Sequence, residues 1–150
     1  MDAYVDGLKM LARRELSEQQ VRQRLVRKGY EDDAVDEAIA RLKGERAIDD
    51  ARVAAAMART ETTVKKRGRL RVTRQIEHAG IARALAREAV DEAFGGLEGD
   101  ALIEASLARR LRGGRPIADD REFQRLYRYL AAQGFEGDVI LRVLRARSVK

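Results

Sequence analysis

Three copies of one pattern, centred on Gly29, Gly80 and Gly134, constrain the fold of this chain more than any other feature of its sequence. The glycines stand 51 and 54 residues apart. In every copy an apolar residue occupies the positions eight and four before the glycine and five and ten after it: Val21, Leu25, Ala34 and Ile39, then Val72, Ile76, Leu85 and Val90, then Leu126, Leu130, Val139 and Leu144. Repeats of this length are typical of proteins assembled from small units that share apolar surface.

Each repeat glycine is expected to end a helix. Glycine adopts the left-handed conformation that closes a helix without steric strain, and the residue after it often packs on a residue five positions earlier. These pairs are apolar in all three copies: Tyr30 with Leu25, Ile81 with Ile76, and Phe135 with Leu130. The pattern therefore predicts a helix, a glycine stop and a second helix in each copy.

Helix starts are marked as well. Ser17 with Gln20 has the spacing of a capping box, in which each residue binds the backbone amide of the other, and Asp119 with Glu122 repeats it. Asp49 is placed to cap a further helix.

An additional helical stretch precedes each copy, so the sequence predicts three units of three helices. Their expected ranges are residues 1–48, 49–97, which hold a basic segment, and 98–150. The expected fold is all-α, a tandem array with an elongated body that can curve. A unit of about 50 residues has a marginal core, and the units either share apolar surface by stacking or are strung out with modest contacts. The glycine-rich residues 95–99 predict a hinge between the second and third units, and residues 113–116 predict a turn inside the third.

Composition agrees with a helical cytoplasmic protein. The chain is 45% hydrophobic and 37% charged but only 5% aromatic, and residues with high helix propensity dominate. It has no cysteine, which excludes disulfides and thiolate metal sites. The longest uncharged apolar stretch, residues 53–58, is too short to cross a bilayer, and no signal-peptide pattern is present. We expect a monomer in the cytoplasm with no membrane association.

Positive charge is concentrated in the second and third predicted units. Residues 1–48 hold ten basic and ten acidic side chains, residues 49–97 hold ten and seven, and residues 98–150 hold eleven and eight. One acid-free cluster, which we call the first basic cluster, consists of Lys65, Lys66, Arg67, Arg69, Arg71 and Arg74. The second basic cluster consists of Arg109, Arg110, Arg112 and Arg115.

The first basic cluster lies where a helix is expected to begin. Positive charge at a helix N-terminus opposes the helix dipole. We therefore favour binding of a polyanion or an acidic protein at this cluster over a plain solvated surface, whereas the two interpretations of the second cluster have equal weight. The net charge of +6 fits a polyanionic partner and fits simple solubility equally well.

Nothing in the sequence has the pattern of an active site. His78 is the only histidine and lies off the apolar face that leads to Gly80. The glycine clusters lack the context of a phosphate-binding loop or a dinucleotide fingerprint. Acidic pairs such as Asp32 with Asp33 mark helix starts, where carboxylates stabilise the helix dipole. We expect no enzyme activity, no cofactor and no metal.

Two segments resemble the RecX family of recombination regulators. Residues 11–17 read Leu-Ala-Arg-Arg-Glu-Leu-Ser, and Lys28-Gly29-Tyr30 follows at the family's spacing. The segment Ile-Asp-Asp-Ala-Arg at residues 48–52 is similar to a second hallmark, although Val53 stands where an aromatic residue is usual and should thin the middle core. The third unit resembles the family more loosely, and the resemblance covers roughly residues 3–147.

The resemblance implies a compact regulator that binds RecA and the RecA–single-stranded DNA filament. Such proteins lodge in the filament groove and limit filament extension, ATP hydrolysis, strand exchange and co-protease activity, and some bind DNA weakly by themselves. The alternative is a general DNA-binding protein that uses the repeats as helix-turn-helix modules. Both basic clusters are the candidate filament- or DNA-binding residues.

Overall fold

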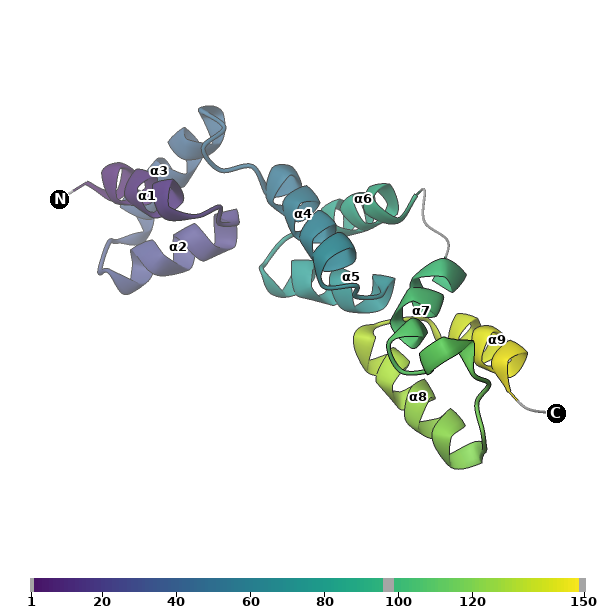
Figure 1. The fold of residues 1–150 in the computed structure, drawn as a ribbon. Coiled ribbons are helices and arrows are strands. Elements are labelled where there is room, and N and C mark those ends of the chain that lie inside the picture. The colour runs from purple at the N-terminus through teal and green to yellow at the C-terminus, as the bar shows by residue number, and fades with distance from the viewer. Residues whose placement is uncertain (1, 96–98, 149–150) are drawn as a thin grey trace. The chain divides into compact units, whose positions relative to one another are not determined.

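The protein folds almost entirely as α-helix (Figure 1). The structure, a computed structural model, describes residues 2–95 and 99–148. Within these ranges it has nine α-helices: α1 (Ala3–Arg13), α2 (Glu18–Arg27), α3 (Asp32–Gly44), α4 (Asp50–Arg59), α5 (Arg69–His78), α6 (Arg83–Phe94), α7 (Gly99–Ala108), α8 (Asp120–Gln133) and α9 (Gly137–Arg147). A short π-helix, η1 (Thr60–Val64), precedes α5, and a 3₁₀ turn, η2 (Arg112–Gly114), follows α7. The all-α prediction is confirmed.

The helices belong to two compact units. One contains Met1–Met57 with Gln75–Ala89, and the other contains Ala58–Arg74 with Val90–Lys150. Helices α4, α5 and α6 therefore contribute to both units. The finer division into three repeats, ending at residues 48 and 97, stays a prediction. Residues 96–98 of the predicted hinge lie outside the described residues, whereas the predicted turn near residue 113 is η2.

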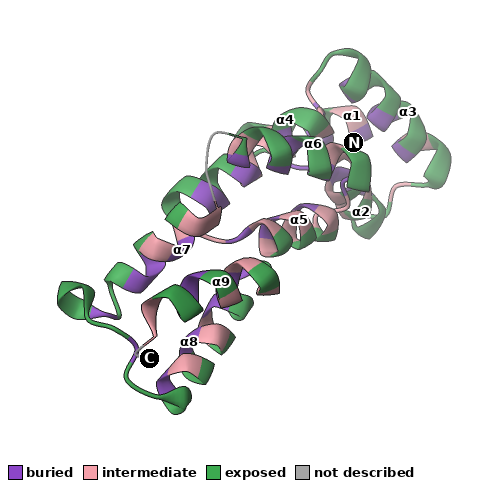
Figure 2. Cartoon of the chain, turned by 90° about the vertical axis from the view of Figure 1, so that its right-hand side faces the viewer, coloured by how far each residue is buried: buried purple, intermediate pink, exposed green. Residues whose placement is uncertain are grey.

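Buried and exposed residues alternate along the helices (Figure 2), and most of the buried residues are apolar. In the first unit, helices α1, α2 and α3 bury a cluster that includes Val21, Leu25 and Leu42. In the second unit, α7, α8 and α9 bury a larger cluster that includes Ile103, Leu130 and Leu144. Within residues 2–95 and 99–148, no helix combines the length and apolar character needed to span a bilayer.

The repeat glycines end helices as predicted. Gly29, Gly80 and Gly134 have φ of 102°, 88° and 100°, in the left-handed region. In the first and third copies the amide after the glycine donates to the carbonyl five residues earlier, Tyr30 to Leu25 and Phe135 to Leu130, both at 3.3 Å. This is the hydrogen bond of a Schellman ending.

One repeat position differs from the predicted pattern. The residues five after each glycine are only half-buried, whereas the next residues, Val35, Ala86 and Ile140, are fully buried. The residue ten positions after each glycine is also buried, and helical neighbours on one face lie three or four residues apart. The sixth residue after the glycine is four positions from this buried residue and shares its face, whereas the fifth is five positions away and does not. The core face of each second helix therefore contains the sixth residue rather than the fifth.

The capping box at Ser17 forms as predicted and also reaches a distant helix end. The Ser17 amide donates to Gln20 Oε1 at 2.9 Å, and the Gln20 amide donates to Ser17 Oγ at 3.2 Å. The Ser17 hydroxyl also donates to the carbonyl of Ala79 at 2.5 Å, next to the glycine turn that ends α5. Ser17 is fully buried, so it joins the start of α2 to the end of α5 within the first unit.

We predict that Ser17→Ala lowers the free energy of unfolding by about 2 kcal/mol, because both a helix cap and a buried hydrogen bond are lost. Gln20→Ala, which removes only the other half of the capping box, should cost about 0.5–1 kcal/mol. Urea denaturation monitored by circular dichroism measures both. Equal losses would show that the bond to Ala79 contributes nothing.

Candidate functional site

The first basic cluster begins in an irregular loop between η1 and α5. The Lys65 amide donates to the Thr60 carbonyl at 3.2 Å, and the Arg67 amide donates to the Glu61 carbonyl at 2.9 Å. Lys66 has a φ of 59°, a left-handed conformation that is uncommon for a residue other than glycine. Single π-turns and strained residues of this kind often occur at functional sites.

A buried carboxylate holds this loop. Glu61 is only 8% exposed, and its side chain lies 3.2 Å from Lys65 Nζ and 4.0 Å from Arg67 Nε. A carboxylate removed from water is costly unless cations compensate it. Glu61 therefore pairs with two of the six predicted binding residues, of which Arg67 is partly buried and Lys65 remains exposed.

The start of α5 docks on the end of α8. The Gly68 amide donates to the Gln133 carbonyl at 2.7 Å, and the Leu70 amide donates to the Gly134 carbonyl at 2.9 Å. The first amides of a helix and the last carbonyls of a helix have no partners within their own helices. Here the two sets satisfy each other.

Two arginines of the first basic cluster reinforce this joint. Arg67 Nη1 donates to Gln133 Oε1 at 2.7 Å, and Arg71 Nη1 donates to the Ala132 carbonyl at 3.2 Å. The C-terminal end of a helix carries partial negative charge. The end of α8 thus offsets the positive charge at the start of α5, so the unfavourable placement that supported a binding role is compensated within the fold.

The joint leaves no room for a side chain at its two glycines. A Cβ on Gly68 would lie 2.4 Å from the backbone carbon of Gly134 and from the Phe135 amide nitrogen. A Cβ on Gly134 would lie 2.2 Å from Arg71 Cβ and 2.5 Å from the Arg71 amide nitrogen. Backbone meets backbone here, so neither position tolerates a larger residue without moving α5.

The other three residues of the first basic cluster differ in whether they form an ion pair within the protein. Arg69 pairs with Asp91, and its guanidinium carbon lies 5.3 Å from the centre of the Phe94 ring. Lys66 and Arg74 are exposed, and neither forms an ion pair with any residue that the structure describes. Only these two are available to an outside partner without breaking an internal contact.

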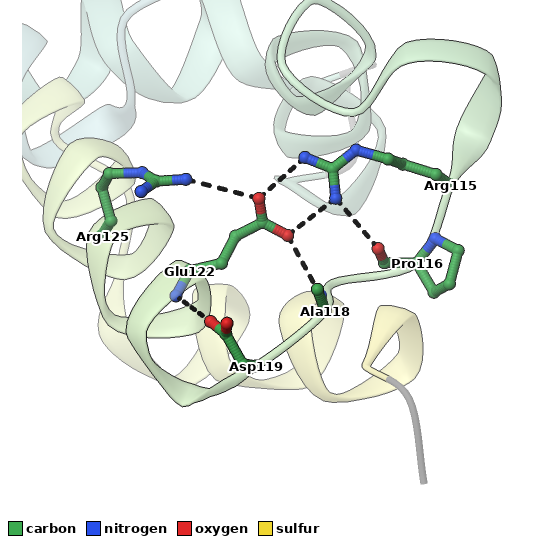
Figure 3. A network of polar contacts seen from close by, with 6 residues as sticks. All are labelled: Arg115, Pro116, Ala118, Asp119, Glu122 and Arg125. Carbon is green, nitrogen blue, oxygen red and sulfur yellow. Dashed lines mark hydrogen bonds and ion pairs between the residues drawn. The ribbon is translucent and has the colours of Figure 1, made fainter.

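In the second basic cluster, Arg115 is held by a carboxylate (Figure 3). Its guanidinium binds Glu122 through two hydrogen bonds of 2.8 and 2.7 Å, and the Ala118 amide donates to the same carboxylate at 3.1 Å. These contacts lower the pKa of Glu122 from its ordinary value of 4.5 to about 2, the Arg115 hydrogen bonds contributing most. The predicted capping box is half formed, because Asp119 accepts from the Glu122 amide at 2.8 Å while the Glu122 side chain points to Arg115 and Ala118.

The other arginines of this cluster are exposed. Arg110 stacks on Tyr129, with 3.6 Å between its guanidinium carbon and the ring centre. Arg109 and Arg112 form no ion pair within residues 2–95 and 99–148.

The contacts attach the two clusters to opposite ends of α8. Arg67 and Arg71 bind at its last residues, whereas Arg115 binds Glu122 in its first turn. Eleven residues of α-helix span roughly 16 Å. All ten predicted residues lie in the second unit, and four of them, Lys66, Arg74, Arg109 and Arg112, are exposed and free of the ion pairs and stacking contacts described above.

A third basic surface escaped the sequence analysis. Cations from α1 and α2 line a groove in the first unit, although residues 1–48 have no net charge. The acids of this segment are concentrated elsewhere, above all at the start of α3. The signal that could have revealed it is the spacing of like charges three or four residues apart on each helix.

Comparison with known proteins gives a consistent match. Residues 3–42 match the family described as RecX, first three-helix domain, and residues 98–144 match RecX, third three-helix domain. A protein from Acidithiobacillus ferrooxidans named Regulatory protein RecX is 34% identical over 141 residues, which cover 93% of this chain and 87% of that protein. A Geobacillus kaustophilus protein of the same name is 33% identical over 143 residues, and the chain spans only 52% of its length.

Among solved structures, the crystal structure of RecX from Lactobacillus salivarius is similar in fold. The TM-score is 0.75 at 19% identity, with 96% of this chain and 93% of that chain covered. An identity this low supports the fold alone.

We predict that Gly134→Ala destabilises the protein by about 3 kcal/mol, whereas Gly29→Ala costs about 1 kcal/mol. Both substitutions place a side chain in a left-handed conformation, but a Cβ on Gly29 has nothing within 4 Å and a Cβ on Gly134 collides with α5. Chemical denaturation of the two variants tests the joint between α5 and α8. Similar losses of stability in the two variants would mean that α5 can move away from the added Cβ without a cost in free energy.

We also predict that Glu122→Gln makes the free energy of unfolding depend less on pH in the acidic range. A carboxylate whose pKa is lowered on folding contributes stability that is fully present above the unfolded pKa, about 4.5, and is lost as the pH falls towards about 2. Comparing denaturation midpoints of the wild type and the variant between pH 6 and pH 2 isolates this carboxylate. Parallel curves would contradict the Arg115–Glu122 assignment.

Proposed function

This chain belongs to the RecX family of regulatory proteins, and from that premise we propose that it binds the RecA–single-stranded DNA filament and restrains it. The regulator lodges in the groove of the filament and limits its extension, ATP hydrolysis, strand exchange and co-protease activity during recombination and DNA repair. It acts as a monomer in the cytoplasm. The observation that carries the proposal is the RecX match in both the first and the third three-helix domains.

The exposed residues of the two basic clusters that lack an internal partner are the proposed contact residues. Lys66, Arg74, Arg109 and Arg112 keep their charges available to DNA phosphates or to acidic side chains of the filament. Arg67, Arg69, Arg71 and Arg115 would first have to give up internal partners. We therefore assign filament contact to the first four and a mainly structural role to the others.

The test is ATP hydrolysis by the cognate RecA on single-stranded DNA, with this protein added in substoichiometric amounts. We expect the rate to fall, and we expect excess free DNA not to restore it. A variant with Lys66, Arg74, Arg109 and Arg112 all changed to Gln should need about tenfold more protein for the same inhibition, a loss of roughly 1.4 kcal/mol of binding free energy.

A charge-matched control separates specific contacts from bulk charge. Arg87, Arg121, Arg128 and Arg145 are also exposed, and none pairs with a described acid, so changing them to Gln alters the net charge equally. Inhibition should then change less than about twofold. Equal weakening by both variants would overturn the site. No effect of the wild type on RecA, together with tight sequence-dependent duplex binding, would overturn the function in favour of a general DNA-binding protein.

A further inference from the structure

A basic groove of the first unit lies between α1 and α2. It has a volume of about 750 Å³ and is lined by Asp6, Lys9, Met10, Arg13, Arg14, Arg24, Arg27 and Lys28. Six of these eight side chains are cationic and one is a carboxylate. The cations come from both helices and from the residues that end them, so the groove exists only when α1 and α2 are packed together.

The one carboxylate in the groove is already engaged. Asp6 accepts a hydrogen bond from the Tyr30 hydroxyl and lies 3.8 Å from Lys28 Nζ. The pKa of Asp6 is lowered, first by the Tyr30 hydrogen bond and further by the charges of Lys28 and Lys9. Its negative charge therefore offsets part of one cation at one edge of the groove.

Five cations remain uncompensated. Lys9, Arg13, Arg14, Arg24 and Arg27 form no ion pair with any residue in the described part of the chain. All but Arg24 are exposed. Elsewhere in the first unit some basic side chains are paired, as Arg22 is with Asp36 and Lys43 with Glu18, whereas the unpaired cations of α1 and α2 gather in this groove.

Folding alone does not account for this arrangement. Cations near the ends of α1 and α2 stabilise the helix dipoles. However, Lys9 and Arg13, like Arg24 and Lys28, stand four residues apart, where like charges repel. The dipole explains charge at each helix end, but it does not explain why the charges of two helices converge on one cavity.

The lining favours a phosphodiester backbone over an acidic protein segment. A bound peptide helix needs apolar anchor pockets, and Met10 is the only apolar side chain among the described residues that line the groove. Four of the six cations are arginines, whose planar group binds phosphate through paired hydrogen bonds. Among these lining residues there is no aromatic, amide or hydroxyl side chain to stack on bases or read their edges.

We propose that the α1–α2 groove binds the backbone of single-stranded nucleic acid without reading its sequence. The groove volume is that of a small-molecule pocket, which suits the backbone of a few nucleotides of a single strand. This site is separate from the four cations assigned to the filament. Its test uses the protein alone, so failure of the RecA assay leaves the groove prediction standing.

The experiment measures binding of a fluorescent 15-nucleotide oligothymidylate by anisotropy, as a function of salt concentration. The groove variant carries Lys9→Gln, Arg13→Gln and Arg27→Gln, and the charge-matched control carries Arg87→Gln, Arg121→Gln and Arg128→Gln. We expect the groove variant to bind at least about tenfold more weakly at low salt. The slope of log K against log salt should fall by about 2, since each lost phosphate contact on a single strand removes about 0.7.

The control variant should retain affinity within about twofold and keep the wild-type slope. Equal weakening of both variants, or an unchanged slope in the groove variant, would overturn the proposal. Displacement of the oligonucleotide by oligoglutamate of the same charge at similar concentration would assign the groove to an acidic protein instead, and stronger competition by a duplex with as many phosphates would overturn the single-strand assignment.

Thermal unfolding shows whether the groove variant keeps its fold. Lys9→Gln alone, which leaves both helix ends unchanged, is a milder second variant. It should reduce the salt slope by about 0.7 with no change in unfolding temperature. An unchanged slope in this variant would also contradict the proposal.

Discussion

The rest of the second unit depends on one contact, in which the start of α5 packs against the end of α8. The Gly68 and Leu70 amides and the Gln133 and Gly134 carbonyls are groups that no helix satisfies by itself, and they satisfy one another. This requires two backbones in direct contact, which explains glycine on both sides of the joint. In the first unit, Ser17 at the start of α2 binds the Ala79 carbonyl beside the Gly80 turn. The same solution is therefore used twice.

The joint between α5 and α8 also changes the interpretation of the first basic cluster. Six cations within ten residues that contain no acid suggest a surface that binds an anion. However, Glu61 supplies negative charge from four residues before Lys65, and Asp91 and the end of α8 supply it from more distant segments. The groove between α1 and α2 is the opposite case, since a segment with no net charge contains uncompensated cations. Charge counted along the chain shows neither arrangement, because ion pairing is decided by the fold.

What the sequence could predict was local. The glycine stops, the Ser17 capping box and the nine helices follow from backbone preferences and hydrogen bonds within a few residues, and all are confirmed. The partners of Arg67 and Arg71 at the end of α8 could not be predicted, because these contacts join segments up to 66 residues apart, whereas Glu61 lies only four residues before Lys65. The buried position six after each glycine was missed for a smaller reason, since alignment on apolar identity does not distinguish the centre of a helix face from its edge.

The glycine turns also make the joints between helices asymmetric. Each joint has two unlike parts, a helix start that inserts and a glycine turn that receives it, so the joint is head-to-tail and not self-complementary. The turns at Gly80 and Gly134 are filled by Gln19 and Arg71 respectively, but at Gly29 an added Cβ would meet nothing within 4 Å. Among the described residues, no helix start is inserted at the Gly29 turn, so the three glycine turns have the same backbone conformation but only two of them receive another helix.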